Sequence, residues 1–396
     1  MRLNKEPVMH PGWLPGRSGP ENRRQAAASV SKVRAPSMTM TIFPCRHPVR
    51  ALAVALALGP VSPLLLAWDY EGHRIVNQLA LASLPADFPR FVREPANAER
   101  IAFLSGEPDR WRNVPDLPLK QSGGSWTDHF CDMEYIPEAG LDWATVPSFR
   151  YDFIVQFAAG RAANAANFKP IDPARNLDHT REWPGFAPWA ITEYFGRLRS
   201  GFSYLKVFEE LGTPEEVANA QANIVAVMGT MGHYVGDCAQ PLHTTKHHNG
   251  WVGENPKGYT TWTGFHSWID GGLAAKGGLQ YSAVAARVTP AEPISLAPRA
   301  DTRDPMFVAV VDYLTAQHRH VEPLYALEQA GKLGNGDQPV TAEGRAFVEA
   351  RLLDGGRMLA NIWLTAQRSA VPDNYLRAAL IKRQAAAAAS PAAARP

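Results

Sequence analysis

Helix-type apolar spacing constrains the fold of this chain most strongly, because strand-type alternation is scarce. Apolar residues recur every three to four positions through five stretches, 75–81, 189–211, 215–237, 306–330 and 343–370. A period near 3.6 places such residues on one face of a helix, where they can pack against other helices. A threonine followed by a proline at 213–214 is typical of a helix start. The sequence therefore predicts an all-α fold.

The N-terminal part of the chain is predicted to be a leader. Two arginines precede the apolar run 51–67, which two prolines interrupt. That run is shorter than the about 20 apolar residues of a membrane span. We interpret 38–67 as a signal peptide cleaved after Ala67, with a retained signal anchor as the alternative. Residues 1–37 are polar and lack periodicity, and we interpret them as untranslated or disordered. We expect a periplasmic or secreted protein.

The remainder is predicted to be one domain, 68–383, with long loops. Glycine and proline are frequent in three segments, 113–126, 168–186 and 248–264, as expected of loops. The end, 384–396, is almost entirely Ala and Pro, and we predict a disordered tail there.

Charge is unevenly distributed along the chain. Nine of the 40 Lys and Arg residues but only two of the 38 Asp and Glu residues precede Trp68. The rest of the chain has 31 basic and 36 acidic residues, a net charge of −5. A protein that binds a phosphate backbone through excess Lys and Arg has the opposite balance. Phosphate binding by this chain would need another source of positive charge, and bound metal ions are the obvious one.

Several common catalytic motifs are absent. The sequence contains no GxGxxG, GxxxxGK[ST], HExxH or GxSxG. The chain therefore lacks the minimal motif residues of a dinucleotide-binding protein, a nucleotide-triphosphate-binding protein, a zincin or a hydrolase with a nucleophile elbow.

A dispersed set of His and Asp residues is the best candidate for chemistry. His233 and Asp237 stand four apart in the stretch 215–237, so both project from the same helix face and can share a cation. Pro241 ends or bends that helix, which can turn His243 toward the same side. A second His-x3-Asp pair follows at 266 and 270. Either pair alone is more often a helix ion pair, but their proximity along the chain favours a metal site.

These residues support a resemblance to a known family. The block Gly-His-Tyr-Val-Gly-Asp-Cys-Ala-Gln-Pro-Leu-His at 232–243, the pair His266-x3-Asp270, and Trp68-x4-His73 after the leader resemble the nuclease type I family. That family comprises secreted single-strand-specific zinc nucleases, and the bacterial zinc-dependent phospholipases C are its structural relatives. The resemblance implies the single multi-helix domain of these enzymes. It also implies a mature N-terminal Trp68 that binds zinc through its own amine and carbonyl.

Carried over position by position, the resemblance implies three zinc ions. The first would be held by Asp109, His129, His233 and Asp237, the second by His243, His266 and Asp270, and the third by Trp68, His73 and the bridging Asp237. Mixed imidazole, carboxylate and amine donors suit zinc better than calcium or magnesium, which prefer oxygen. Three divalent ions would also make the acidic domain locally positive.

The resemblance implies further roles near these ligands. Arg112 matches a position that stabilises phosphate charge, with an ordinary ion pair as the alternative. Asp132 and Glu134 would orient the attacking water, or else be solvated carboxylates. Phe130 matches an aromatic that stacks on a base, with a core phenylalanine as the alternative. Cys131 and Cys238 each lie within two residues of a ligand of the same zinc, which makes a disulfide between them plausible.

Three functions remain open from the sequence. A single-strand endonuclease comes first, with single-stranded DNA or RNA as substrate, and a phospholipase C acting on phospholipid comes second. A metal-stabilised binding protein is the third. An inserted segment around 145–205 carries five aromatics that fit a lipid-accepting groove or a core, Trp183, Phe186, Trp189, Tyr194 and Phe195. His247 and His248 are extra ligands or loop residues without a metal role. We expect a monomer without an obligate protein partner.

Overall fold

The computed structural model describes residues 70–112 and 126–389. Within these ranges the chain forms helices and no β-strand, which confirms the predicted all-α class. The predicted leader, Trp68, most of the first predicted loop and the last seven residues lie outside the described residues. No described helix has the length and apolar character that crossing a membrane requires.

The helices vary widely in length. They are α1 (Tyr70–Ser83), α2 (Pro95–Leu104), α3 (Glu107–Arg112), α5 (Tyr135–Glu138), α6 (Arg150–Ala163), α7 (Ala187–Leu211), α8 (Pro214–Ala239), α9 (Phe265–Ser267), α10 (Leu273–Gly277), α11 (Tyr281–Val284), α12 (Pro305–His318), α13 (Val321–Gln329), α14 (Ala342–Ser369) and α15 (Asn374–Ala389). Short 3₁₀ turns include η2 (Trp126–His129) and η5 (Pro241–Thr244), and η6 (Trp268–Gly272) is a π-helical turn.

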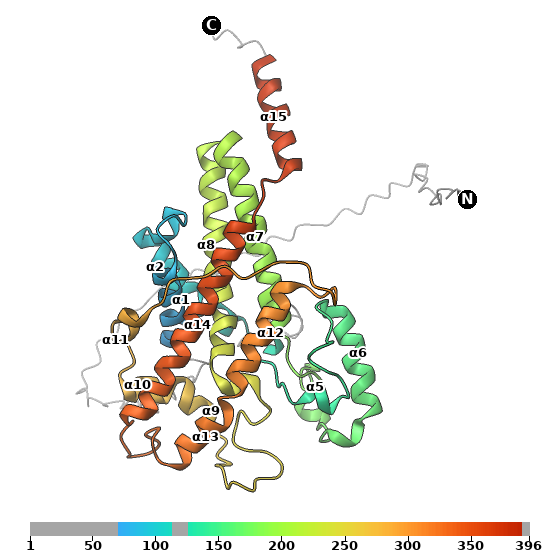
Figure 1. The fold of residues 1–396 in the computed structure, drawn as a ribbon, viewed down its shortest axis with the longest axis vertical. Helices are drawn as coiled ribbons and strands as arrows, with labels where there is room; N and C mark the ends of the chain where they lie inside the picture. Colours follow the sequence, from blue (N-terminus) through green and yellow to red (C-terminus); the bar gives the residue numbers. More distant parts are fainter. Residues whose placement is uncertain (1–69, 113–125, 390–396) are drawn as a thin grey trace, which may run out of the picture. The chain divides into compact units, whose positions relative to one another are not determined.

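Helix α8 is the central element of the core. It packs against α7, α14, α2 and α1, and Figure 1 shows α7, α8 and α14 running side by side. Its start is fixed by a capping box, in which Thr213 Oγ1 accepts from the Glu216 N–H and the Glu216 carboxylate accepts from the Thr213 N–H. From Met228 to Ala239 every side chain of α8 is buried, so this half of the helix presents its polar residues to protein rather than to water.

Helices α1 and α8 approach closely because α8 carries glycines where they meet. A Cβ atom at Gly232 would lie 1.6 Å from Asn77 Oδ1, and one at Gly236 would lie 2.8 Å from His73 Nδ1. Asn77 also ties α1 to its neighbours, because its amide donates to the carbonyls of Ile101 and Gly229 at 2.7 and 3.1 Å. The glycines therefore allow His73 to reach the buried half of α8.

Two predicted boundaries differ from the structure. The apolar stretch 306–330 forms two helices, α12 and α13. Pro323 explains the break, because its ring cannot donate a helical hydrogen bond and clashes with the carbonyl four residues earlier, at Arg319. The tail predicted to be disordered from Gln384 instead continues α15 to Ala389. Alanine has the highest intrinsic helix propensity, which outweighs the low complexity of this segment.

The segment 145–205, predicted to be an insertion, forms α6, a loop and most of α7. Four of the aromatic residues weighed for a groove or a core, Phe186, Trp189, Tyr194 and Phe195, are buried, whereas Trp183 is half-buried. Trp189 stacks on Phe153 of α6 with ring centres 4.0 Å apart, in a hydrophobic cluster that also holds α12 residues. For these four buried aromatics, the prediction that they belong to the hydrophobic core rather than to a lipid-accepting groove is confirmed.

Candidate metal centre

Eight of the nine predicted metal ligands lie within the described residues, and the structure brings all eight together. They are His73 on α1, Asp109 on α3, His129 on η2, His233 and Asp237 on α8, His243 on η5, His266 on α9 and Asp270 on η6. Three groups among them have ligand atoms within 4.8 Å of one another: His73 with His233 and Asp237, Asp109 with His129 and His233, and His243 with His266 and Asp270. Each group could hold a metal ion.

We call the first two groups together the inner cluster, and the third group the outer cluster. The inner cluster contains His73, Asp109, His129, His233 and Asp237, and none of these residues is more than 2% exposed. In the outer cluster His243 and Asp270 are also buried, but the His266 side chain is 20% exposed. The outer cluster is therefore the one that solvent can reach.

Asp237 is the central carboxylate. Its Oδ2 lies 3.0 Å from His129 Nδ1 and 3.1 Å from His233 Nε2. Its Oδ1 faces the opposite way, 3.4 Å from His73 Nε2 and 3.7 Å from His243 Nδ1. A carboxylate whose two oxygens face different donor sets can serve two ions, the arrangement expected of the predicted bridging role.

Hydrogen bonds to the backbone orient two of the histidines. His233 Nδ1 lies 2.7 Å from the Ser105 carbonyl, and His243 Nδ1 lies 2.9 Å from the His129 carbonyl. A carbonyl only accepts, so each Nδ1 carries the proton and a neutral ring has its lone pair on Nε2. The His233 Nε2 atom lies 2.8 Å from His129 Nδ1, and His243 Nε2 lies 3.0 Å from His266 Nε2. Nitrogens this close share either a hydrogen bond or a metal ion.

A π-helical turn places the carboxylate of the outer cluster. Asp270 Oδ2 lies 3.0 Å from His266 Nε2, four residues earlier in the chain. Its other oxygen accepts from the side-chain amide of Gln240 at 2.8 Å. The same Gln240 caps η5 by accepting from the Leu242 N–H at 2.6 Å. π-helical turns are rare and are frequent at functional sites.

The electrostatics of the clusters follow from burial and from the facing charges. Burial lowers the pKa of His129 to about 4. Burial acts in the same direction on His243, but Asp237 and Asp270 outweigh it and raise its pKa to about 9. Burial opposes the charge on Asp237, yet the facing histidines hold its pKa well below its usual range. Asp237 therefore remains a buried carboxylate that requires positive charge beside it.

The polar atoms of the inner cluster are incompletely paired by the protein. Buried atoms without a hydrogen-bond partner among the described residues include both ring nitrogens of His73, His129 Nε2 and Asp237 Oδ1. Leaving such atoms unpaired costs about 1–3 kcal/mol each. Imidazole and carboxylate donors that converge at these distances fit a divalent metal, and no cysteine takes part. A metal ion would satisfy several of these atoms at once.

The other predicted site residues lie beside the inner and outer clusters. The Nε atom of Arg112 is 2.9 Å from Asp109 Oδ1, and its guanidinium stacks over the Trp126 ring at 4.9 Å. Asp132 is buried, and its Oδ1 atom lacks a hydrogen-bond partner among the described residues. Burial and the charge of Glu134 raise the pKa of the Asp132 carboxyl well above its usual range. Phe130 is half-buried.

The structure does not contain the disulfide between Cys131 and Cys238 that the sequence suggested. Cys131 and Cys238 are free thiols, and both are completely buried. Burial raises the pKa of both thiols, so they stay neutral and pack as small apolar side chains. Proximity along the chain to ligands of one site was therefore insufficient evidence for a bond.

Sequence reasoning missed the residues that support the metal-ligand candidates. Gly232 and Gly236 admit α1, Gln240 holds Asp270, and the Ser105 carbonyl orients His233. A signal for the glycines was present, because they are spaced four apart on the helix that carries His233. The role of a backbone carbonyl such as that of Ser105 leaves no trace in residue type.

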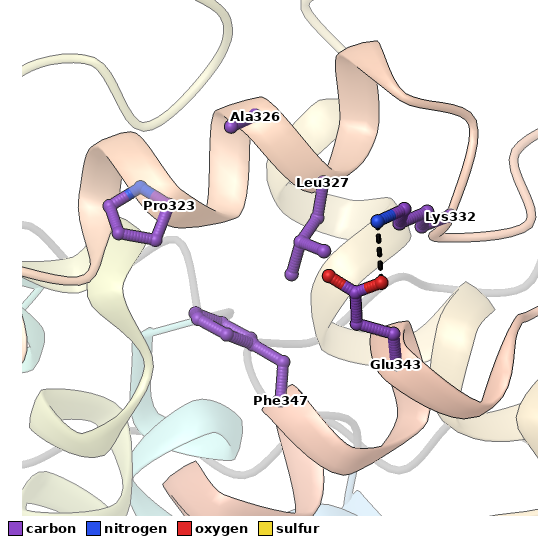
Figure 2. A pocket seen from close by; sticks show the side chains of 6 residues that line it. All are labelled: Pro323, Ala326, Leu327, Lys332, Glu343 and Phe347. Atoms are coloured by element: carbon purple, nitrogen blue, oxygen red, sulfur yellow. Dashed lines mark hydrogen bonds and ion pairs between the residues drawn. The ribbon is translucent and has the colours of Figure 1, made fainter.

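A separate depression between α13 and α14 lacks comparable chemistry. It measures about 490 Å³, and Figure 2 shows Leu327 and Phe347 beside an ion pair between Lys332 and Glu343. None of the residues that line it belongs to the inner or outer cluster. Its only carboxylate is neutralised by a lysine, so the metal centre is the stronger candidate for a functional site.

What this site could bind is therefore inferred from the arrangement of its side chains. The described chain holds several His and Asp groups that could bind metal ions, most of them buried and one open to solvent. Comparison with known proteins adds no assignment: no protein-family model matches the chain, and no curated protein matches it.

Proposed function

We propose that this protein is a zinc-dependent phosphodiesterase that hydrolyses single-stranded nucleic acid. The observation that carries the proposal is the convergence of eight His and Asp side chains from seven separate elements on one site. Their donors suit zinc, and with Trp68 at a processed N-terminus they would hold three ions. Bound zinc ions would supply Lewis-acid chemistry, lowering the pKa of water and neutralising charge on a phosphoryl group.

The side chains around the clusters have complementary tasks in this proposal. Asp132, with one carboxyl oxygen left unpaired, would orient the attacking water. Arg112 would hold Asp109 in place through the 2.9 Å ion pair and present the rest of its guanidinium to a phosphoryl oxygen. Phe130, half-buried next to His129, would stack on a base of an unpaired strand.

Two observations favour nucleic acid over phospholipid. Of the five aromatics proposed for a lipid groove, all but the half-buried Trp183 are buried, so Phe186, Trp189, Tyr194 and Phe195 do not line a groove for acyl chains. Phe130 is partly exposed beside the metal centre, as a base-stacking residue must be. Phospholipase C activity is the second candidate, because the same metal chemistry would cleave a lipid phosphodiester.

The test uses the secreted protein, after its N-terminus has been sequenced. Single-stranded DNA, single-stranded RNA, duplex DNA and phosphatidylcholine vesicles are each incubated with the protein as purified, after EDTA treatment, and after zinc is restored. We expect rapid cleavage of the single strands, loss of cleavage with EDTA, and recovery with zinc. Cleavage of phosphatidylcholine alone would replace the nuclease with the phospholipase. Hydrolysis of no substrate by the zinc-loaded protein would refute both.

A further inference from the structure

Two adjacent histidines in the loop after η5 have different surroundings. His247 stacks on Trp251 with ring centres 3.9 Å apart and planes 9° apart, and its Nδ1 accepts from the Val252 N–H at 3.1 Å. Its ring is therefore part of the packing of the loop. His248 has no such stacking partner among the described residues, and its side chain is 40% exposed.

The ring of His248 faces the outer cluster. Its centre lies 5.9 Å from that of His266, and the two planes are 63° apart. The two histidines already assigned to the outer cluster, His243 and His266, have ring centres 4.6 Å apart. With Zn–N bonds of about 2.0–2.1 Å, two imidazoles on one ion place their ring centres roughly 4.5–6 Å apart. Both distances fit a shared ion.

His248 also has the backbone contact that orients the other metal-ligand candidates. Its Nδ1 lies 3.2 Å from the Thr245 carbonyl, as His233 and His243 contact the carbonyls of Ser105 and His129. The Oδ1 atom of Asp132 lies 3.9 Å from the same nitrogen. Histidines that bind metals commonly donate their other N–H to a carbonyl or a carboxylate. This contact leaves the Nε2 lone pair of a neutral His248 available.

The outer cluster has room for another ligand. Three protein donors are assigned to it, whereas zinc takes four or five ligands, and its solvent side is where His266 is exposed. We propose that His248 is a fourth protein ligand of the divalent ion in the outer cluster, supplied by the loop that follows η5. The inference rests on the metal centre of the proposed function and not on its substrate.

The test measures metal binding directly. Protein stripped with a chelator is titrated with Zn²⁺ against a competing indicator, and with Co²⁺ while its visible absorption is recorded. His248→Ala and His248→Gln are compared with the wild type and with His179→Ala, which removes an exposed histidine paired with Glu182. We expect both His248 variants to bind one ion, that of the outer cluster, about 10–100-fold less tightly and to change the Co²⁺ spectrum, with the other ions and the His179 variant unaffected.

The outcomes separate this inference from the proposed function. Unchanged affinity and an unchanged Co²⁺ spectrum in His248→Gln would overturn the inference, even if the wild type cleaves nucleic acid. A wild type that binds every ion but cleaves nothing would overturn the function, and weaker binding in the His248 variants would then still support the inference. The Gln variant keeps a polar side chain, so it decides the question if the Ala variant does not fold.

Discussion

The inner and outer clusters are built from the same two side-chain types in different surroundings. The inner cluster is sealed between α1, α3, η2 and α8, whereas the outer cluster lies on η5 and the α9–η6 segment with His266 partly exposed. Buried donors fix the position of an ion, and an accessible donor set allows water and substrate to exchange. We therefore propose that the inner cluster holds its ions in a fixed position and that the outer cluster exchanges water and substrate at its ion.

Asp237 and Asp270 give the sharpest test of this difference, and the largest expected effect. Asp237→Asn removes the charge that faces His73, His129, His233 and His243. Breaking a buried charge pair costs about 3–5 kcal/mol, so we expect a loss of that order in the free energy of unfolding and loss of metal from the inner cluster. Asp270→Asn should release only the outer ion and destabilise the protein less.

Urea unfolding and metal analysis of both variants measure these effects. Glu322→Gln is the control, because this carboxylate forms an exposed ion pair with Lys257 and should cost no more than about 1 kcal/mol. Equal destabilisation and equal metal loss in the Asp237 and Asp270 variants would remove the distinction between the clusters.

The sequence was informative where a residue type and its spacing determine the chemistry. His233 and Asp237 are four apart on a helix, and this alone placed two donors on one face of α8. His73, Asp109 and His129 come from other elements, and only the family resemblance proposed them as ligands. Their convergence depends on packing between helices, which single-sequence periodicity does not contain.

Other features could not be predicted because they depend on the backbone or on three-dimensional proximity. The Ser105 carbonyl orients His233 whatever side chain residue 105 carries. The buried state of Cys131 and Cys238 as thiols depends on their exact geometry, which closeness along the chain to shared ligands does not determine. The break between α12 and α13, in contrast, was readable from the sequence, because the ring of Pro323 clashes with the carbonyl four residues earlier in a continuous helix.

In the metal-free protein, His243 and His129 should change the free energy of unfolding in opposite directions as pH varies. This effect is smaller than that of Asp237→Asn. The pKa of His243 is raised to about 9, so its stabilisation is complete below the unfolded value near 6.5 and is lost as pH rises through 9. At ~1.4 kcal/mol per unit this amounts to about 3 kcal/mol. The pKa of His129 is lowered to about 4, so stability falls as pH drops from 6.5 toward 4.

The free energy of unfolding of chelator-treated protein, measured between pH 4 and pH 10, shows both the acidic limb of the profile, where His129 acts, and the alkaline limb, where His243 acts. We expect a maximum near pH 6.5. His243→Gln should flatten the alkaline limb, and His129→Gln the acidic limb. A variant that flattened neither limb would show that other groups control the profile and would remove the electrostatic contrast between the two histidines.

Replacing Phe130 gives the smallest expected effect, and it tests whether substrate is recognised beside the inner cluster. Its ring is fixed on one side, because a Cβ atom at Gly185 would lie 2.7 Å from the ring atom Cδ2, and the residue is half-buried. A base that stacks on the remaining surface gains about 1–3 kcal/mol. Phe130→Ala should therefore raise KM for single-stranded oligonucleotides while leaving kcat close to the wild-type value, since stacking holds substrate and transition state alike.

Phe149→Ala is the matched control, because Phe149 is 73% exposed and contributes no base contact in this proposal. An alkyl phosphodiester without a base is the control substrate, and Phe130→Ala should hydrolyse it as fast as the wild type does. Equal losses on both substrates would mean that Phe130 supports the neighbouring His129 in the inner cluster. A loss confined to oligonucleotides would place base recognition directly beside the inner cluster, so that one element, η2 with the residue after it, both holds the metal and selects the unpaired strand.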